Sequence, residues 1–370
     1  MKKNNFFSEH ELIIELCKFV DADKDKLEHL MERNLQWPYI LGQLLYHRMG
    51  GAAYLSLNKS GLLGKVNREF RNTLKTVYDS NVVKAQSMYQ ALEIVASVIQ
   101  NLDCPYALLK GAYLLSVYPV GLRTSNDVDV LISQEDISKL EVLLKAAGFV
   151  QGNVRNGGFT PASRKEIINS RINRGETVPY IKTINLPQME FLEIDINFSL
   201  DFSARKNNSN VVQMLKNSSP LIQTTNGCLC TLDNPDFLIH LCCHLYKEAS
   251  IYAYLVLGRD LSLYKFADIY LLLHRWSNTE VFTVLSERIH AYGLQRECYY
   301  AFLRTKELFG IESKGLNALI SAIKPQNVEY LKEIFRPEQN KVFQYDEPFA
   351  EWLFVSSKEE RLHENIIERA

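Results

Sequence analysis

The stretch YALLKGAYLLSVYPVGLRTSNDVDVLI, residues 106–132, decides the fold of this chain. It opens with a short apolar run that stops at Lys110 and Gly111, continues through an apolar segment of helix length, and closes with Asp127-Val-Asp129 in a second apolar run. Because successive side chains of a strand point to opposite faces, Asp127 and Asp129 share one face and the intervening valine faces the core. Two carboxylates one repeat apart repel each other, and a divalent ion that prefers hard oxygen ligands removes this repulsion. The pattern therefore predicts a metal-binding strand.

A second stretch repeats this arrangement further along the chain. Residues 189–200, MEFLEIDINFSL, alternate between apolar and polar side chains, as a half-buried strand does. Glu193, Asp195 and Asn197 share the polar face of this strand. It predicts a second carboxylate-bearing strand.

The surrounding segments predict an α/β unit. Residues 66–101 have the apolar spacing of a long amphipathic helix that leads into the first strand, and a helix is expected over 135–147 after the second. Residues 151–188 combine several glycines and prolines with six cations. They are either a solvated loop or hairpin pair, or a mobile flap whose cations meet phosphate or an acceptor.

The two ends of the chain are expected to be helical. From residue 235 onward the apolar period is that of helices, with a last pair expected near 325–335 and 347–367. The predicted domains are an N-terminal helical region at 1–101, an α/β core at 102–200 with the flap at 151–188, and a C-terminal all-helical domain at 201–370.

Composition narrows the class of protein. The chain has 370 residues, of which 46% are hydrophobic and 23% charged, and its net charge is −1, which argues against a broad basic face that grips long nucleic acid. No apolar run is long enough to predict a membrane span, and glutamates interrupt the first apolar segment, unlike a signal peptide. Seven scattered cysteines are expected to be reduced thiols, which favours a cytoplasmic location.

The central stretch resembles the nucleotidyltransferase superfamily, and within it most closely a family of uncharacterised nucleotidyltransferases. That family has an apolar-Lys-Gly turn, a Tyr-Pro pair, an arginine and an Asp-apolar-Asp strand, and the resemblance extends over roughly residues 25–310. Ala112 departs from the wider superfamily, which has a second small residue, glycine or serine, at this turn. The matching residues are Leu109, Lys110, Gly111, Tyr118, Pro119, Arg123, Asp127, Val128 and Asp129.

The resemblance implies an α/β nucleotidyltransferase core with a small mixed sheet, flanked by helices. It places the metal ligands and catalytic carboxylates at Asp127, Asp129 and Asp195, with Mg²⁺ or Mn²⁺ as cofactor. Lys110, Gly111 and Arg123 are expected to hold phosphates. Two alternatives remain: that Lys110 solvates the end of its strand, and that Arg123 pairs with Asp127. Glu193 is the neighbour most easily confused with Asp195.

The resemblance also reaches the C-terminal helices. It matches His244, Lys247 and Asp268, which either line the acceptor side of the site or, for Lys247 and Asp268, form a structural ion pair. The i, i+4 pair of His240 and His244 also has the spacing of metal ligands, although the adjacent cysteines are better explained as buried thiols.

The expected reaction moves a nucleoside monophosphate, AMP from ATP or another NTP, to a small-molecule, peptide or protein acceptor and releases pyrophosphate. The alternative is a non-catalytic nucleotide-binding or antitoxin-like module with the same fold. A transfer RNA-modifying enzyme is disfavoured, because the C-terminal segment mixes charges of both signs instead of forming a basic stripe.

Overall fold

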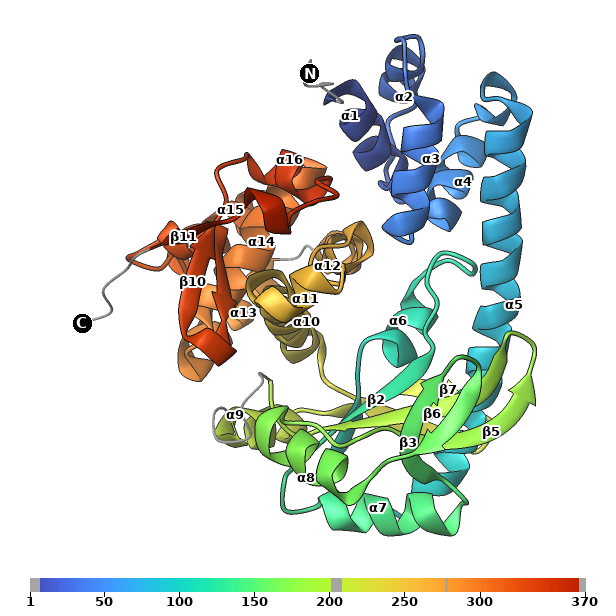
Figure 1. Cartoon of the computed structure of the whole chain (residues 1–370), viewed down its shortest axis with the longest axis vertical. Helices are drawn as coiled ribbons and strands as arrows, with labels where there is room; N and C mark the ends of the chain where they lie inside the picture. The colour runs from blue at the N-terminus through green and yellow to red at the C-terminus, as the bar shows by residue number, and fades with distance from the viewer. Residues whose placement is uncertain (1–6, 201–207, 277–278, 366–370) are drawn as a thin grey trace. The chain divides into compact units, whose positions relative to one another are not determined.

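The computed structural model describes residues 7–200, 208–276 and 279–365 (Figure 1). Its contacts divide the chain into two compact units. The first combines Met1–Tyr78 with Leu241–Ala370, and the second is Asp79–His240. The long helix α5, Arg68–Ile99, begins in the first unit and ends in the second.

The second unit is built on an eight-stranded sheet in the order β4-β3-β5-β6-β2-β1-β8-β7. The sheet is mixed, as predicted: β2 pairs in parallel with β6 and β1 in parallel with β8, while the other neighbours are antiparallel. It is larger than the small sheet expected from the sequence. The strands are β1 (Tyr106–Leu108), β2 (Asp127–Ile132), β3 (Val150–Arg155), β4 (Gly158–Pro161), β5 (Tyr180–Leu186), β6 (Met189–Asn197), β7 (Ser219–Thr224) and β8 (Gly227–Thr231).

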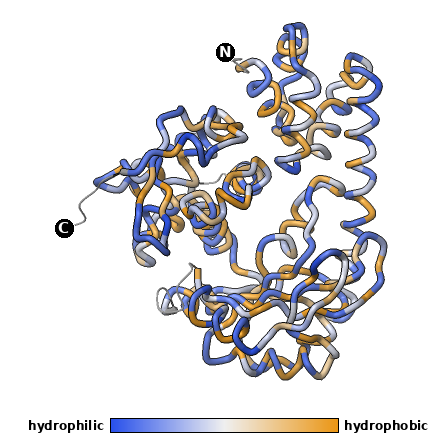
Figure 2. The backbone as a smooth tube through the Cα atoms, in the orientation of Figure 1, coloured by the Kyte–Doolittle hydropathy of each residue, from blue (hydrophilic) through white to orange (hydrophobic). Residues whose placement is uncertain are grey.

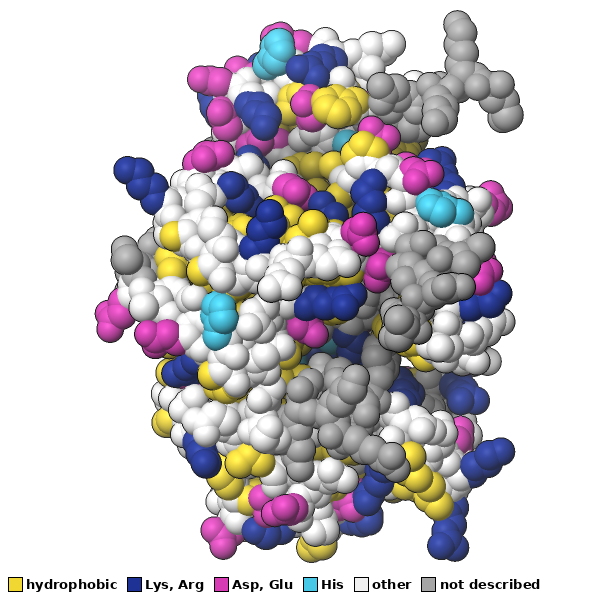
Figure 3. Space-filling model, turned by 90° about the vertical axis from the view of Figure 1, so that its left-hand side faces the viewer, with side chains coloured by type: hydrophobic (Ala, Val, Ile, Leu, Met, Phe, Trp, Pro, Cys, Tyr) yellow, Lys and Arg dark blue, Asp and Glu magenta, His cyan; other side chains and the backbone are white. Residues whose placement is uncertain are grey.

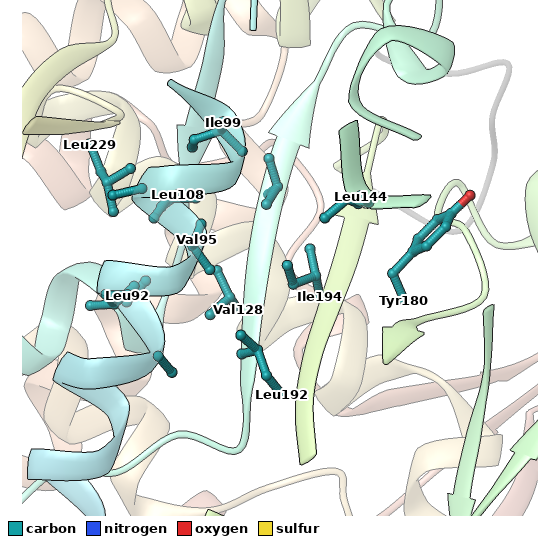
Figure 4. Packing of buried hydrophobic residues seen from close by; sticks show 14 of the residues in the cluster. Leu92, Val95, Ile99, Leu108, Val128, Leu144, Tyr180, Leu192, Ile194 and Leu229 are labelled. Carbon is teal, nitrogen blue, oxygen red and sulfur yellow. The ribbon is translucent and has the colours of Figure 1, made fainter. Parts of the chain in front are cut away.

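The core of this unit lies between the sheet and the helices α5 and α7 (Ile137–Ala146). The predicted long helix is confirmed as α5, and the Asn67 side chain accepts a hydrogen bond from the Phe70 N–H at its start. Figure 4 shows the packing of these helices on the strands. The buried side chains include Leu92, Val95 and Ile99 from α5, Leu144 from α7, Val128 from β2, and Leu192 and Ile194 from β6.

The predicted flap has more regular structure than its sequence suggests. Strands β3 and β4 form an antiparallel hairpin, as one of the two alternatives predicted, and β5 joins the main sheet. Between β4 and β5 lies a helix that was not predicted from the sequence, α8 (Arg164–Asn173). Ser163 and Glu166 cap it reciprocally through side-chain and backbone hydrogen bonds, which explains why the helix begins there.

Further helices of the second unit are α6 (Gly111–Val117) and α9 (Asn208–Lys216). Helix α7 begins at Ile137 instead of the predicted residue 135, because the Ser133 hydroxyl bonds the Asp136 side chain and does not cap a helix.

The first unit is mainly helical, as predicted. Figure 2 shows hydrophobic and hydrophilic residues alternating along these helices, which is the pattern of amphipathic segments. Its helices are α1 (Phe7–Leu16), α2 (Lys24–Met31), α3 (Trp37–Tyr46), α4 (Gly50–Lys59), α10 (Asn234–Ser250, which begins in the second unit), α11 (Tyr252–Val256), α12 (Leu263–Arg275), α13 (Thr279–Tyr292), α14 (Gln295–Phe309), α15 (Lys314–Ala322) and α16 (Phe349–Leu353).

The prediction of a helical C-terminal pair is confirmed only in part, since the 3-10 turn Glu329–Lys332 and α16 are helical within the two expected ranges. Strands β9 (Glu333–Arg336), β10 (Lys341–Gln344) and β11 (His363–Asn365) form a three-stranded antiparallel sheet, with β9 at the end of the first expected helix, β11 near the end of the second, and β10 between the two. The proline that opens the 3-10 turn Pro337–Gln339 cannot continue a helix, and Asn340 has a φ of 51°, so the chain reverses into a hairpin. The domain is therefore not all-helical.

Three further predictions from composition concern surface charge, the cysteines and membrane-spanning helices. Basic and acidic side chains are interspersed on the face shown in Figure 3. All seven cysteines are free, as predicted. Across residues 7–200, 208–276 and 279–365, no helix combines the length and hydrophobicity needed to cross a lipid bilayer.

Candidate active site

The candidate site is built on the parallel pair β2 and β6. In their register, Asp127 pairs with Glu193 and Asp129 pairs with Asp195. Neighbouring strands lie only about 4.8 Å apart, and alternate residues share a face. Four carboxylates therefore form a two-by-two array on one face, while the valines and isoleucines between them enter the core.

The electrostatics of the array reflect this crowding. Burial raises the pKa of the Asp195 carboxyl well above its usual range, and the charges of Asp129, Asp127 and Glu176 raise it further, whereas Lys110 lowers it. Burial, together with the charge of Asp127, also raises the pKa of Glu193. The array therefore favours the binding of positive charge, because each added cation reduces the repulsion between neighbouring carboxylates.

Hydrogen bonds fix two of the carboxylates. Asp129 is only 5% exposed, and its Oδ1 accepts from Lys110 Nζ at 2.9 Å and from Asn197 Nδ2 at 3.3 Å. The Ser125 hydroxyl donates to Asp127 Oδ1 at 2.8 Å. The sequence pattern predicts Asn197 on the carboxylate face of its strand but gives it no role, and it does not mark Ser125 as a site residue.

The turn that carries Lys110 and Gly111 is closely packed. A side chain at Gly111 would place its Cβ 2.4 Å from Ser125 Oγ and 2.5 Å from Ser125 Cβ, so only glycine fits. Lys110 has φ 44° and ψ −117°, an uncommon conformation for a residue with a side chain. Glycine at position 111 therefore leaves room for Ser125, the hydrogen-bond partner of Asp127, to pack against the turn. The sequence alone did not predict this contact.

Two residues of α5 hold the loop that leads into β2. Asn81 Nδ2 donates to the Gly121 carbonyl at 3.0 Å, and Lys84 Nζ donates to the Asn126 side chain. Arg123, predicted to bind phosphate or to pair with Asp127, lies in this loop, partly buried, and donates from Nη1 to the Thr124 carbonyl. The long helix therefore positions the segment that precedes the Asp127 strand.

The part of the predicted flap that follows α8 is hydrogen-bonded to β6, the strand that carries Asp195. The Thr177 N–H donates to the Ile196 carbonyl at 2.9 Å, and the Phe198 N–H donates to the Gly175 carbonyl at 3.0 Å. These bonds bring Glu176 beside β6, where its charge acts on Asp195. Arg174 pairs with Glu176, Nη2 to Oε1, at 3.0 Å. No feature of the sequence marked Glu176.

The donor chemistry of the array fits a divalent cation. Carboxylate oxygens are the ligands that Mg²⁺ and Mn²⁺ prefer, and the repulsion that raises the Asp195 pKa is what such an ion relieves. In the part of the chain that the structure describes, no three histidine, cysteine, aspartate or glutamate side chains are arranged to hold a metal ion as they stand. The side chain of Asp129 is instead bonded to Lys110.

The other predicted site residues belong to the first unit. His244 lies on α10, with Nε2 3.3 Å from Glu248 Oε2, and Lys247 is on the same helix. Asp268, on α12, is 3% exposed. The roles predicted for these residues on the acceptor side of the site stay predictions. Cys242 and Cys243 are buried free thiols, as expected.

Comparison with known proteins agrees with the resemblance noted in the sequence. The family described as "Uncharacterised nucleotidyltransferase" matches residues 33–310. A solved structure of an antigenic nucleotidyltransferase-like protein from Paracoccidioides brasiliensis is similar at 12% identity and a TM-score of 0.37, covering 65% of this chain and 94% of that one. No curated protein matches the chain. The match over residues 33–310 shows that the chain belongs to the uncharacterised nucleotidyltransferase family and is a transferase of nucleotidyl groups.

Proposed function

We propose that the protein transfers a nucleoside monophosphate, AMP from ATP, to the oxygen of a small-molecule, peptide or protein acceptor, using Mg²⁺ or Mn²⁺ held by Asp127, Asp129 and Asp195. The acceptor oxygen forms a bond to the α-phosphorus, the bond to the bridging oxygen breaks, and pyrophosphate leaves with those electrons. A hydroxyl acceptor loses its proton in the same reaction.

The register of β2 and β6 carries this proposal. It sets Asp129 beside Asp195 and Asp127 beside Glu193 on one face of the sheet. A structural sheet seldom keeps four carboxylates together, because their mutual repulsion is costly unless cations pair with them. Phosphoryl transfer needs such a cluster, since several carboxylates must converge to hold metal and triphosphate.

The proposed roles follow from the positions of the residues. Asp127 and Asp129 bind metal and triphosphate, and Asp195 completes the site and receives the acceptor proton. Lys110 and Arg123 contact phosphate oxygens, while Gly111 keeps the turn close to Ser125 and thereby holds Asp127. When bound, the metal neutralises charge that develops on the phosphates.

A screen of the four nucleoside triphosphates tests the proposal. Each is added with Mg²⁺, with Mn²⁺ or with EDTA, and the melting temperature is measured. A ligand that binds only the folded protein stabilises it by mass action, so ATP with metal should raise the melting temperature and EDTA should abolish the rise. The same rise with EDTA would contradict a metal-dependent site.

A further inference from the structure

Lys110 bonds to the carboxylate assigned to the metal. Its Nζ lies 2.9 Å from Asp129 Oδ1, and both side chains are shielded, with 21% of the lysine side chain and 6% of the aspartate side chain exposed. Asn197 donates to the same oxygen. Oδ1 therefore already accepts two hydrogen bonds, which use both of its lone pairs, so a metal ion can bind this oxygen only if one donor moves away. Repulsion between the ammonium and the metal ion favours movement of the lysine.

The backbone keeps Lys110 in this position. The Leu109 N–H donates to the Asp129 carbonyl at 2.9 Å, which joins the lysine turn to the aspartate strand. On the other side, the Leu114 N–H donates to the Lys110 carbonyl at 2.9 Å. Between these bonds Lys110 has a φ of 44°, and such strained residues occur most often at functional sites. The turn thus delivers the ammonium to the carboxylate array.

The negative charge of the four carboxylates explains why a lysine ammonium lies beside them. Asp127, Asp129, Glu193 and Asp195 share one face, and Lys110 acts on Asp195 against the effect of its acidic neighbours. A lysine is a compact point charge on a flexible stem, so it can exchange one anionic partner for another without movement of the backbone. A triphosphate at the array would offer it such a partner.

We propose that Lys110 is an exchangeable counterion, which pairs with Asp129 when the nucleotide is absent and with a nucleotide phosphate when the nucleotide is bound. This inference rests on the proposed function. In the first state the ammonium competes with a metal ion for Asp129, so metal alone binds weakly. In the second state the phosphate draws the ammonium away and Asp129 becomes available. Lys110 therefore couples nucleotide binding to metal binding.

The coupling is reciprocal, because a nucleotide that raises the affinity for metal by some factor is itself bound more tightly with metal by the same factor. Replacing the ammonium by a neutral group removes the competitor for Asp129 and the partner of the phosphate together. Metal alone should then bind more tightly, and the gain in metal affinity caused by nucleotide should shrink. A lysine that only stabilises its turn would change neither quantity.

Titration with Mn²⁺, with free Mn²⁺ measured by electron paramagnetic resonance, tests the exchange in the full chain. Wild type and Lys110→Met are titrated alone and with a non-hydrolysable ATP analogue. We expect Lys110→Met to bind Mn²⁺ alone at least about fivefold more tightly than wild type, the lower end of typical couplings, and to lose most of the gain from the analogue. Lys110→Gly is a second variant, since glycine adopts positive φ readily and keeps the turn.

Lys139→Met is the matched control. Lys139 Nζ pairs with Asp136 Oδ1 at 2.8 Å on α7, so this variant breaks a lysine–aspartate pair away from the array and should leave Mn²⁺ binding unchanged. Unchanged or weaker Mn²⁺ binding in both Lys110 variants, with binding still lost in Asp129→Asn, would overturn the exchange and leave the proposed function intact. Absence of Mn²⁺ binding to wild type, with and without the analogue, would overturn both.

Discussion

Asp129 on β2 and Asp195 on β6 occupy paired positions of two parallel strands, and their side chains share one face of the sheet. Asp129 is held by Lys110 and Asn197, whereas the carboxyl of Asp195 has a strongly raised pKa because it is buried among acidic neighbours. The charge of Asp129 is thus balanced by an ammonium, whereas the environment of Asp195 disfavours its charged form. We therefore propose that the pair is the centre of the site.

The two carboxylates of β6 should differ in importance. Asp195→Asn should abolish nucleotidyl transfer while some ATP binding remains, because Asp127 and Asp129 still hold one cation. Glu193→Gln should reduce transfer much less. Release of pyrophosphate in the presence of an acceptor, measured beside ATP affinity, checks both variants. An essential Glu193 and a dispensable Asp195 would show that the roles are reversed.

The contact between Gly111 and Ser125 predicts a stability effect that a second mutation rescues. Gly111→Ala should destabilise the fold by roughly 1–3 kcal/mol, because the new Cβ has no space beside Ser125. Ser125→Gly removes both atoms that it would meet, so the double variant should regain most of that loss. Chemical denaturation of the four proteins provides the measurement, and strictly additive effects would contradict the contact.

Arg174 tests whether the flap contributes a cation to the site. It pairs with Glu176, which forms an isolated bridge with Asn197 on β6, two positions after Asp195. If a phosphate competes for this guanidinium, Arg174→Ala should raise the KM for ATP about tenfold, as expected for loss of a hydrogen bond to a charged group. Arg164→Ala, exposed at the other end of α8, is the matched control and should leave KM unchanged. An unchanged KM in Arg174→Ala, as in the control, would contradict a role of Arg174 in binding ATP.

His47 predicts a pH dependence of stability in the first unit. Burial lowers its pKa from the usual 6.5 to about 3, and Leu263 N–H donates to its Nδ1 at 3.3 Å. The folded state therefore contains His47 as the neutral imidazole. The contribution of this group to the free energy of unfolding is complete above pH 6.5 and decreases as the pH falls toward 3. Between pH 7 and pH 5 the free energy of unfolding should fall by about 2 kcal/mol through this group. In His47→Gln this part of the pH dependence should vanish, and an unchanged profile would contradict the assignment.

The local patterns of the sequence were sufficient for the carboxylate strands. The alternation around Asp127, Asp129 and Asp195 predicted which side chains share a face, because the two-residue period of a strand is a local property. The long helix α5 followed in the same way from its apolar period.

Features that depend on contacts between residues far apart in the chain could not be predicted from the sequence. The parallel pairing of Leu108 on β1 with Thr231 on β8 joins segments more than a hundred positions apart, and no local sequence pattern predicts this pairing. Strands β9 and β11 are too short for their period to be distinguished from that of a helix, which explains why helices were predicted there. The bond of Lys110 to Asp129 depends on an unusual φ at the lysine, which its side chain does not predict.

Calorimetric titration of ATP with Mg²⁺ into wild type and into the double variant Asp127→Asn, Asp129→Asn tests whether the carboxylates of β2 bind the metal. We expect wild type to bind ATP only when Mg²⁺ is present, and the double variant to remain folded but to bind ATP equally weakly with and without Mg²⁺. Equal, metal-dependent binding of ATP by the two proteins would show that the carboxylates of β2 do not form the metal site.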